Sequence, residues 1–153
     1  MALLAAPAKG CVIIMTIPME YRQASADFDH FILDARDTAG LQTTNQAYTM
    51  VQAVLQAFRR RLDISEALLF ASVLPPVLRA IFVTDWDLEE PTVPFSGRLA
   101  MTREVQAFRG DHNVSPASAI ADVAAALRRN VDEAKLDRVL ARLPQGAVDF
   151  WRA

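Results

Sequence analysis

A segment of twenty-two residues occurs twice in this chain. Residues 54–75 align without a gap with residues 123–144, sixty-nine positions later, and seven of the twenty-two aligned pairs are identical. Average composition would give roughly two identities in a segment of this length. The interval is longer than the repeats of most solenoid proteins, about 20–50 residues. The sequence therefore predicts an internal duplication, in which one unit of several helices is used twice.

Apolar residues follow a helical period along most of the chain. In a predicted helix that begins at Thr44, spacings of three and four produce one apolar stripe. Its members are Ala47, Val51, Val54, Leu55, Phe58 and Leu62. No stretch of strand length alternates with a period of two. We therefore expect an all-α fold, a helical bundle of seven to eight helices built from two repeated helical units at about 25–84 and 99–152.

Capping residues and prolines set the predicted helix boundaries. Ser25 and Ser115 are expected as N-caps. Asp63 and Glu66 have the spacing of a capping box at the start of a further helix. Pro75-Pro76 ends that helix, because proline lacks an amide donor and the residue before it avoids helical geometry.

Length and composition fit one globular domain. The chain has 153 residues, about half of them apolar, and a formal net charge of −2. This charge gives no general attraction to nucleic acid or to an anionic membrane. No apolar run is long enough to cross a bilayer, so we expect no membrane association. The single Cys11 has no disulfide partner within the chain, which favours a reducing compartment and a cytoplasmic location.

The N-terminal segment is apolar, but it lacks the basic start and the cleavage site of a signal peptide. Met15 and Met19 are alternative start positions. We expect residues 1–18 to be a disordered or artefactual extension, and residues 19–153 to form a single helical domain with the internal repeat.

Motifs of catalysis and cofactor binding are absent from the sequence. It has two histidines, His30 and His112, and no nucleophile elbow, P-loop or dinucleotide-binding glycine motif. The pair Asp27-x-x-His30 fits an exposed helix face better than a metal site. The acidic run that starts at Asp85 lacks the turn glycine and the final glutamate of a calcium loop. We therefore expect no cofactor and no metal, and we favour a noncatalytic protein over an enzyme.

Arginines stand side by side in both copies of the repeat. Residues 59–61 are three arginines and residues 128–129 are two. Phosphate contacts are one interpretation, but consecutive residues point in different directions around a helix. Their position at predicted helix ends is explained by capping and by the helix dipole. We therefore do not expect nucleic acid as a partner.

The connector between the copies, residues 85–98, has no helical period and is unusually long for a compact domain. It carries four acidic and two large aromatic residues, with no basic residue before Arg98. The candidate interaction surface consists of Asp85, Trp86, Asp87, Glu89, Glu90 and Phe95. The aromatic residues either pin the connector to the core or present it to a partner, because partner surfaces are enriched in such side chains.

Two functional hypotheses follow. The first is a noncatalytic module that binds a protein partner, or a second copy of itself, through a helix groove or the acidic connector. The second is a ligand-binding or catalytic bundle with a pocket between the repeats, lined by Tyr48, Trp86 and His112. A filled junction and an exposed apolar groove would favour the first hypothesis. A deep pocket with convergent polar groups would favour the second.

A set of short segments is similar to one known family. The segments are Asn45-Gln46-Ala47-Tyr48, Phe58-Arg59-Arg60-Arg61-Leu62, Glu66-Ala67, Leu74-Pro75-Pro76-Val77-Leu78-Arg79-Ala80, Asp85-Trp86 and Leu143-Pro144. Together they resemble the bacterial family called domain of unknown function 2267, over about residues 19–151. These are core and capping positions, so the resemblance implies a bacterial, soluble, helical protein and assigns no functional residue.

Overall fold

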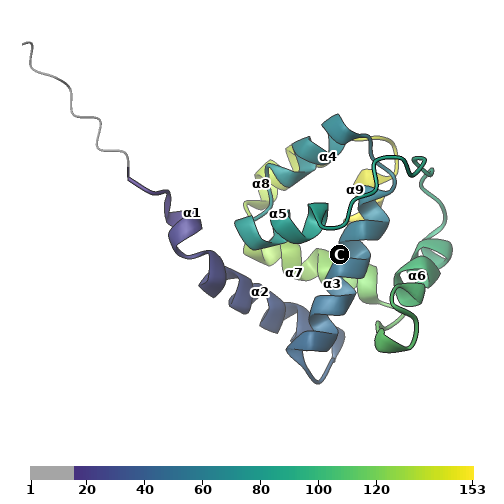
Figure 1. Ribbon diagram of the computed structural model, residues 1–153, viewed down its shortest axis with the longest axis horizontal. Helices are drawn as coiled ribbons and strands as arrows, with labels where there is room; N and C mark the ends of the chain where they lie inside the picture. The colour runs from purple at the N-terminus through teal and green to yellow at the C-terminus, as the bar shows by residue number, and fades with distance from the viewer. Residues whose placement is uncertain (1–15) are drawn as a thin grey trace, which may run out of the picture.

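The fold is entirely helical over residues 16–153, the part of the chain that this computed structural model describes (Figure 1). Nine α-helices and one 3-10 helix occur there, and no strand. They are α1 (Met19–Arg22), α2 (Ala24–Ala39), α3 (Thr44–Arg59), α4 (Ile64–Ala71), α5 (Pro76–Val83), α6 (Arg98–Ala107), η1 (Gly110–His112), α7 (Ala119–Asn130), α8 (Glu133–Leu140) and α9 (Ala147–Phe150). No helix of this range is both long and apolar enough to cross a membrane. The all-α prediction is confirmed.

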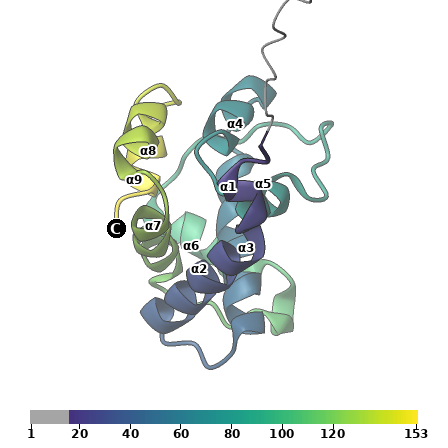
Figure 2. The ribbon, with the colours of Figure 1, turned by 90° about the vertical axis from the view of Figure 1, so that its left-hand side faces the viewer.

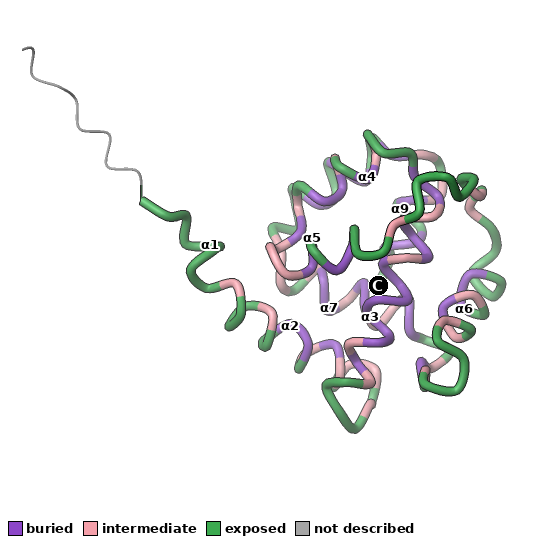
Figure 3. Tube along the Cα trace, in the orientation of Figure 1, coloured by how far each residue is buried: buried purple, intermediate pink, exposed green. Residues whose placement is uncertain are grey.

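The predicted number of seven to eight helices is one too low, because of α1. This single turn follows Pro18 and buries none of its residues, so it has no apolar stripe that the sequence pattern reveals. All four of its residues are exposed (Figure 3), and it contacts the body of the protein through Glu20, which lies 3.7 Å from Arg79 of α5. The predicted extension, residues 1–18, lies outside the described residues except for residues 16–18, which are exposed coil.

Two predicted N-caps are wrong. Ser25 lies inside the first turn of α2, because that helix starts at Ala24, directly after Gln23 joins it to α1. Ser115 is buried in the turn before α7, where its backbone amide and hydroxyl both donate to the side-chain oxygen of Asn113. The residue that precedes α7 is Ser118. Ser115 is thus satisfied within the turn before α7 and does not cap that helix.

Other local predictions are confirmed. Asp63 accepts a hydrogen bond from the amide of Glu66, and the Glu66 carboxylate accepts one from the amide of Asp63, both at 2.8 Å. This capping box starts α4 where the sequence places it. A further helix end is set by Gly40, which ends α2 with a φ of 68°, a left-handed conformation that glycine adopts without a steric cost. Pro75 is the N-cap of α5 and Pro76 is its first residue, whereas α4 already ends at Ala71.

Helix α3 is the centre of the fold. Eleven of its sixteen residues are buried, and it packs against α2, α5, α6 and α7. Figure 2 shows α2 lying across α3 and beside α7. At one end of the molecule α4 packs against α8. The two halves of the chain are therefore interleaved rather than set side by side.

A cluster of aromatic rings fills the junction between the two halves. Phe58 of α3 lies 4.7 Å from Phe70 of α4 and 5.0 Å from Phe150 of α9, between ring centroids. Trp151 lies 5.4 Å from both Phe58 and Phe70. All four side chains are fully buried. Rings at these distances and angles pack as in other protein interiors, so this part of the junction is solid core.

Candidate functional site

The connector leaves α5 at Thr84, crosses the end of α3 and enters α6 at Arg98 without regular structure. Backbone and side-chain contacts attach it to the rest of the fold. The amide of Val93 donates to the carbonyl oxygen of Arg60 at 3.0 Å. Further along, the ring of Phe95 lies 6.0 Å from that of Phe58 and packs against the core. The connector is thus attached to the fold along its course. The interpretation that its aromatic residues pin it to the core holds for Phe95 and for Trp86, since both are partly buried and pack against the core.

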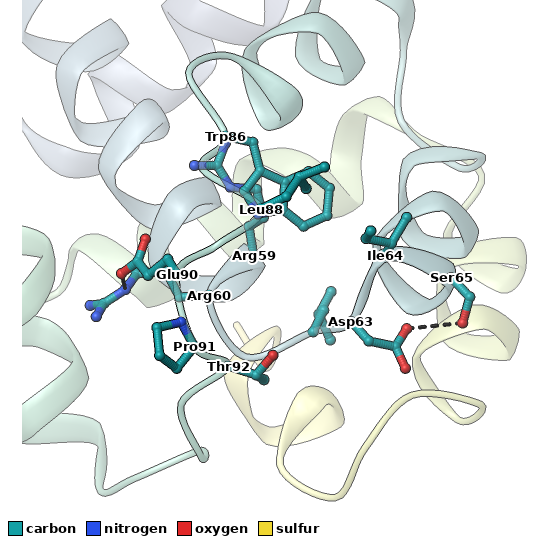
Figure 4. A pocket seen from close by; sticks show the side chains of 11 residues that line it. Arg59, Arg60, Asp63, Ile64, Ser65, Trp86, Leu88, Glu90, Pro91 and Thr92 are labelled. Atoms are coloured by element: carbon teal, nitrogen blue, oxygen red, sulfur yellow. Dashed lines mark hydrogen bonds and ion pairs between the residues drawn. The ribbon is translucent and has the colours of Figure 1, made fainter.

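A cleft of about 390 Å³ lies between the first half of the connector and the turn from α3 into α4 (Figure 4). Its volume is at the lower end of the range for ligand pockets, about 300–1,000 Å³. Side chains from three segments line it: Arg59, Arg60, Leu62, Asp63, Ile64, Ser65, Trp86, Leu88, Glu90, Pro91 and Thr92. We call this feature the connector cleft.

Arg59 is buried and lines the connector cleft. Its Nη1 donates to the carbonyl oxygens of Phe82 at 3.0 Å and Thr84 at 2.8 Å, where α5 ends and the connector begins. Its guanidinium lies 5.3 Å from the ring centroid of Trp86, a cation–π distance. Burial lowers the pKa of Arg59, and the negative charges of Glu90 and Asp85 partly offset that effect. This arginine therefore caps a neighbouring helix, not its own, and fixes the position of Trp86.

Arg60 and Arg61 form an ion cluster behind the cleft with Glu104 of α6. Arg61 Nη2 lies 2.8 Å from Glu104 Oε2, and Arg60 Nη1 lies 2.5 Å from Glu104 Oε1. Arg60 also pairs with Glu90 at 2.9 Å, which ties the connector to α3. Burial alone would raise the pKa of Glu104, but hydrogen bonds and charges from Arg61 and Arg60 outweigh it and lower that pKa. All three neighbouring arginines thus have structural partners.

Alternate residues of the connector face the cleft. Trp86, Leu88 and Glu90 line it, whereas Asp85, Asp87 and Glu89 are exposed and do not. Within residues 16–153 the last three carboxylates take part in no ion pair. We call these three exposed carboxylates, which alternate along the connector with the residues that line the cleft, the acidic rim.

Exposed apolar side chains continue from the cleft along α4. Leu88 is 61% exposed, Ile64 is 51% exposed and Leu68 is 61% exposed. Ile64 and Leu68 are four residues apart and so share one face of the helix. A strip of this kind next to an acidic rim matches the apolar centre and polar edge of a protein interface. We call Trp86, Leu88, Ile64 and Leu68 the apolar strip.

The candidate pocket residues lie in different places. Tyr48 lines a depression between α2 and α3 together with Phe28 and Leu33. Trp86 lines the connector cleft, and His112 is exposed in η1. The sequence did not single out Ile64, Leu88 or the binding of Arg59 to α5. Ile64 and Leu68, two apolar residues on an otherwise solvated helix face, could have indicated this surface. The hydrogen bonds of Arg59 could not be predicted, because their acceptors lie 23 and 25 residues further along the chain and no local pattern relates them.

The candidate metal residues do not converge. Among residues 16–153 no group of three His, Cys, Asp or Glu side chains is placed to hold a metal ion. His30 instead lies 2.9 Å from the side-chain oxygen of Asn130, through Nδ1. Asp87 accepts a hydrogen bond from the amide of Glu89 at 3.0 Å, as an ordinary turn residue does.

The chain matches one protein family. A family model described as "Uncharacterized conserved protein (DUF2267)" matches residues 28–150, which includes both copies of the repeat and the connector. Among curated proteins, none matches the chain.

Proposed function

Because this chain belongs to the DUF2267 family of uncharacterized conserved proteins, its function has to be argued from its own surface, and we propose that it is a noncatalytic interaction module. It binds a segment of a partner protein in the connector cleft. The observation that carries the proposal is the apolar strip, whose Leu88 and Leu68 are both 61% exposed beside a cleft that is already formed. Burying exposed apolar area is the main favourable term in most protein association.

The rigidity of the connector supports this proposal. Trp86 is held by Arg59, Glu90 is held by Arg60, and the backbone of Val93 is hydrogen-bonded to α3. A surface fixed before binding loses little conformational entropy when the partner arrives. Aromatic and aliphatic side chains in such positions commonly act as the energetic centre of an interface.

We also infer that the two halves are copies of one helical unit. Helices α4 and α8 begin and end sixty-nine residues apart, the interval of the sequence repeat. Arg59 donates to the carbonyl oxygen of Phe82, and Arg128 donates to that of Trp151, again with both members shifted by sixty-nine. Helix α2 packs against α7 while α6 packs against α3, as expected of two copies that exchange their first helices.

A comparison of the two copies supports a role for the apolar strip. Ile64 and Leu68 of α4 correspond to Glu133 and Asp137 of α8. Those two carboxylates lie 3.1 Å and 2.8 Å from Arg128 and neutralise it. The same face of the same helix is thus charged in one copy and apolar in the other. Because the unit folds with carboxylates at these positions, exposed Ile64 and Leu68 serve something other than folding.

The alternative, a small-ligand or catalytic pocket between the repeats, has less support. The aromatic cluster of Phe58, Phe70, Phe150 and Trp151 occupies that junction. Tyr48 and Trp86 line separate depressions, so they do not act on one ligand.

Affinity purification from the organism that encodes the chain tests the proposal, with Leu88→Ser as the variant and Leu99→Ser as the matched control. Leu99 is 64% exposed at the start of α6 and does not line the cleft, so both substitutions remove a similar exposed leucine. We expect partners to be lost with Leu88→Ser and kept with Leu99→Ser, while circular dichroism shows the same helix content. Identical partner sets for the two variants would refute the proposal.

A further inference from the structure

We infer that the segment bound in the connector cleft is basic, with lysine or arginine residues that flank one or two apolar anchors. This inference rests on the proposed function and adds the chemistry of the partner. The apolar strip receives the anchors, and the acidic rim receives the cations.

The charge around the cleft carries the inference. Six carboxylates surround it or lie directly behind it, whereas only three guanidinium groups do so. The carboxylates are Asp63, Asp85, Asp87, Glu89, Glu90 and Glu104, and the guanidinium groups are those of Arg59, Arg60 and Arg61. The net local charge is negative, although the chain as a whole is close to neutral. Complementary charge steers a partner toward a surface and selects its register.

The placement of these charges strengthens the argument. The three cations are buried or paired. Arg59 is buried and donates to backbone carbonyl oxygens, Arg61 is buried and pairs with Glu104, and Arg60 pairs with Glu90 and Glu104. Of the six carboxylates, those of Asp63 and of the acidic rim have no ion-pair partner in residues 16–153, and all four of these residues are exposed. An approaching chain therefore meets unpaired carboxylates at the surface. Glu90 and Glu104 neutralise Arg60 and Arg61, and the charges of Glu90 and Asp85 act on the buried Arg59.

The geometry also limits the size of the anchors. A cleft of about 390 Å³ suits one or two apolar side chains, not a whole folded domain. Ile64 lines the cleft, and Leu68 extends the apolar contact by one helical turn beyond it. The rim residues Asp85, Asp87 and Glu89 alternate along the connector with Trp86, Leu88 and Glu90, which line the cleft. A short segment with apolar side chains toward the strip and basic side chains toward the rim satisfies both surfaces.

The test selects from a library of displayed random twelve-residue peptides on the full chain at low salt. Enriched sequences are then synthesised, and their dissociation constants are measured by fluorescence anisotropy. One variant neutralises the rim, Asp85→Asn, Asp87→Asn and Glu89→Gln combined. These replacements keep the hydrogen-bonding side chains, and asparagine also tolerates the left-handed backbone at position 85, where φ is 52°. A matched control removes three exposed carboxylates elsewhere, with Asp29→Asn, Asp37→Asn and Asp111→Asn.

We expect the enriched peptides to combine apolar residues with lysine or arginine. The neutralised rim should weaken their binding roughly tenfold, because each exposed ion pair contributes a factor of roughly 1.5 to 5. The control with the same net charge should change it less than twofold. Raising the salt concentration should weaken binding to the native chain much more than binding to the neutralised rim.

Other outcomes separate this inference from the proposed function. Peptides that are lost with Leu88→Ser but carry no basic residues, or that ignore the neutralised rim, overturn the inference and leave the binding module standing. Peptides that bind Leu88→Ser and the native chain equally well overturn both. A dimer in sedimentation velocity that Leu88→Ser abolishes shows that a second copy occupies the cleft, and this also overturns the inference.

Discussion

Replacing Glu104 with glutamine is expected to lower the free energy of unfolding by about 3 kcal/mol. Breaking a buried ion pair by removing one partner typically costs about 3–5 kcal/mol, because the other charge remains buried. The partner left behind is Arg61, whose side chain is only 4% exposed. The Glu104 side chain is 24% exposed and glutamine retains one acceptor, so the lower part of this range applies. Arg60 adds little, since it is partly exposed and keeps Glu90.

Urea-induced unfolding, followed by circular dichroism at 222 nm, measures this loss. A matched control is Glu133→Gln, whose carboxylate pairs with Arg128 but has a side chain that is 59% exposed. We expect the control to lose less than about 1 kcal/mol. In a background with Arg61→Met, Glu104→Gln should cost about 1 kcal/mol or less, which gives a coupling energy of about 2 kcal/mol. Equal losses for the two glutamate variants, or additive effects of the pair, would contradict this reasoning.

The ion pair of Glu104 and Arg61 also predicts how the free energy of unfolding depends on pH. The pKa of Glu104 is lower in the folded state than in the unfolded chain, because hydrogen bonds and charges from Arg61 and Arg60 outweigh the opposite effect of burial. The contribution of Glu104 to the free energy of unfolding is therefore complete above the pKa in the unfolded chain, about 4.3 for a glutamate. It is lost as pH falls through the pKa in the folded state. The stability difference between the native chain and Glu104→Gln should be constant above about pH 5 and shrink below about pH 4.

Gly146→Ala is expected to lower the free energy of unfolding by about 2–4 kcal/mol in the same urea assay, since φ is +107° there and an added Cβ would lie 2.7 Å from the Phe95 Cβ. Its control, Gly97→Ala, adds a Cβ in open space and should change stability by less than about 1 kcal/mol; equal losses would be inconsistent with this contact. Asp34→Asn should cost about 1 kcal/mol at pH 7, because Arg129 lies 2.7 Å from the carboxylate and is half exposed. The hydrogen bond from Arg129 lowers the pKa of Asp34 despite burial. The difference in free energy of unfolding between the native chain and Asp34→Asn should therefore disappear as pH falls through the pKa of Asp34 in the folded state. A difference that persists at about pH 2 would argue against the ion pair.

The candidate site shows where sequence reasoning was sufficient. The irregular path of the connector, its acidic character and its aromatic residues are properties of consecutive residues, and they pointed to this segment. The attachment of Phe95 to the core was one of two alternatives that the sequence left open. The choice between them depends on Phe58, thirty-seven positions earlier, which no local pattern relates to it.

The sequence by itself determined the helices and most of their ends. Apolar spacing, the capping box at Asp63 and the prolines at 75 and 76 act within a few residues, so their effects can be read from neighbouring positions. Only the tertiary structure decided that Ser115 turns toward Asn113 and that Arg59 binds the end of α5. Those outcomes depend on groups that packing brings together, and a contact between distant segments produces no periodic pattern in the sequence.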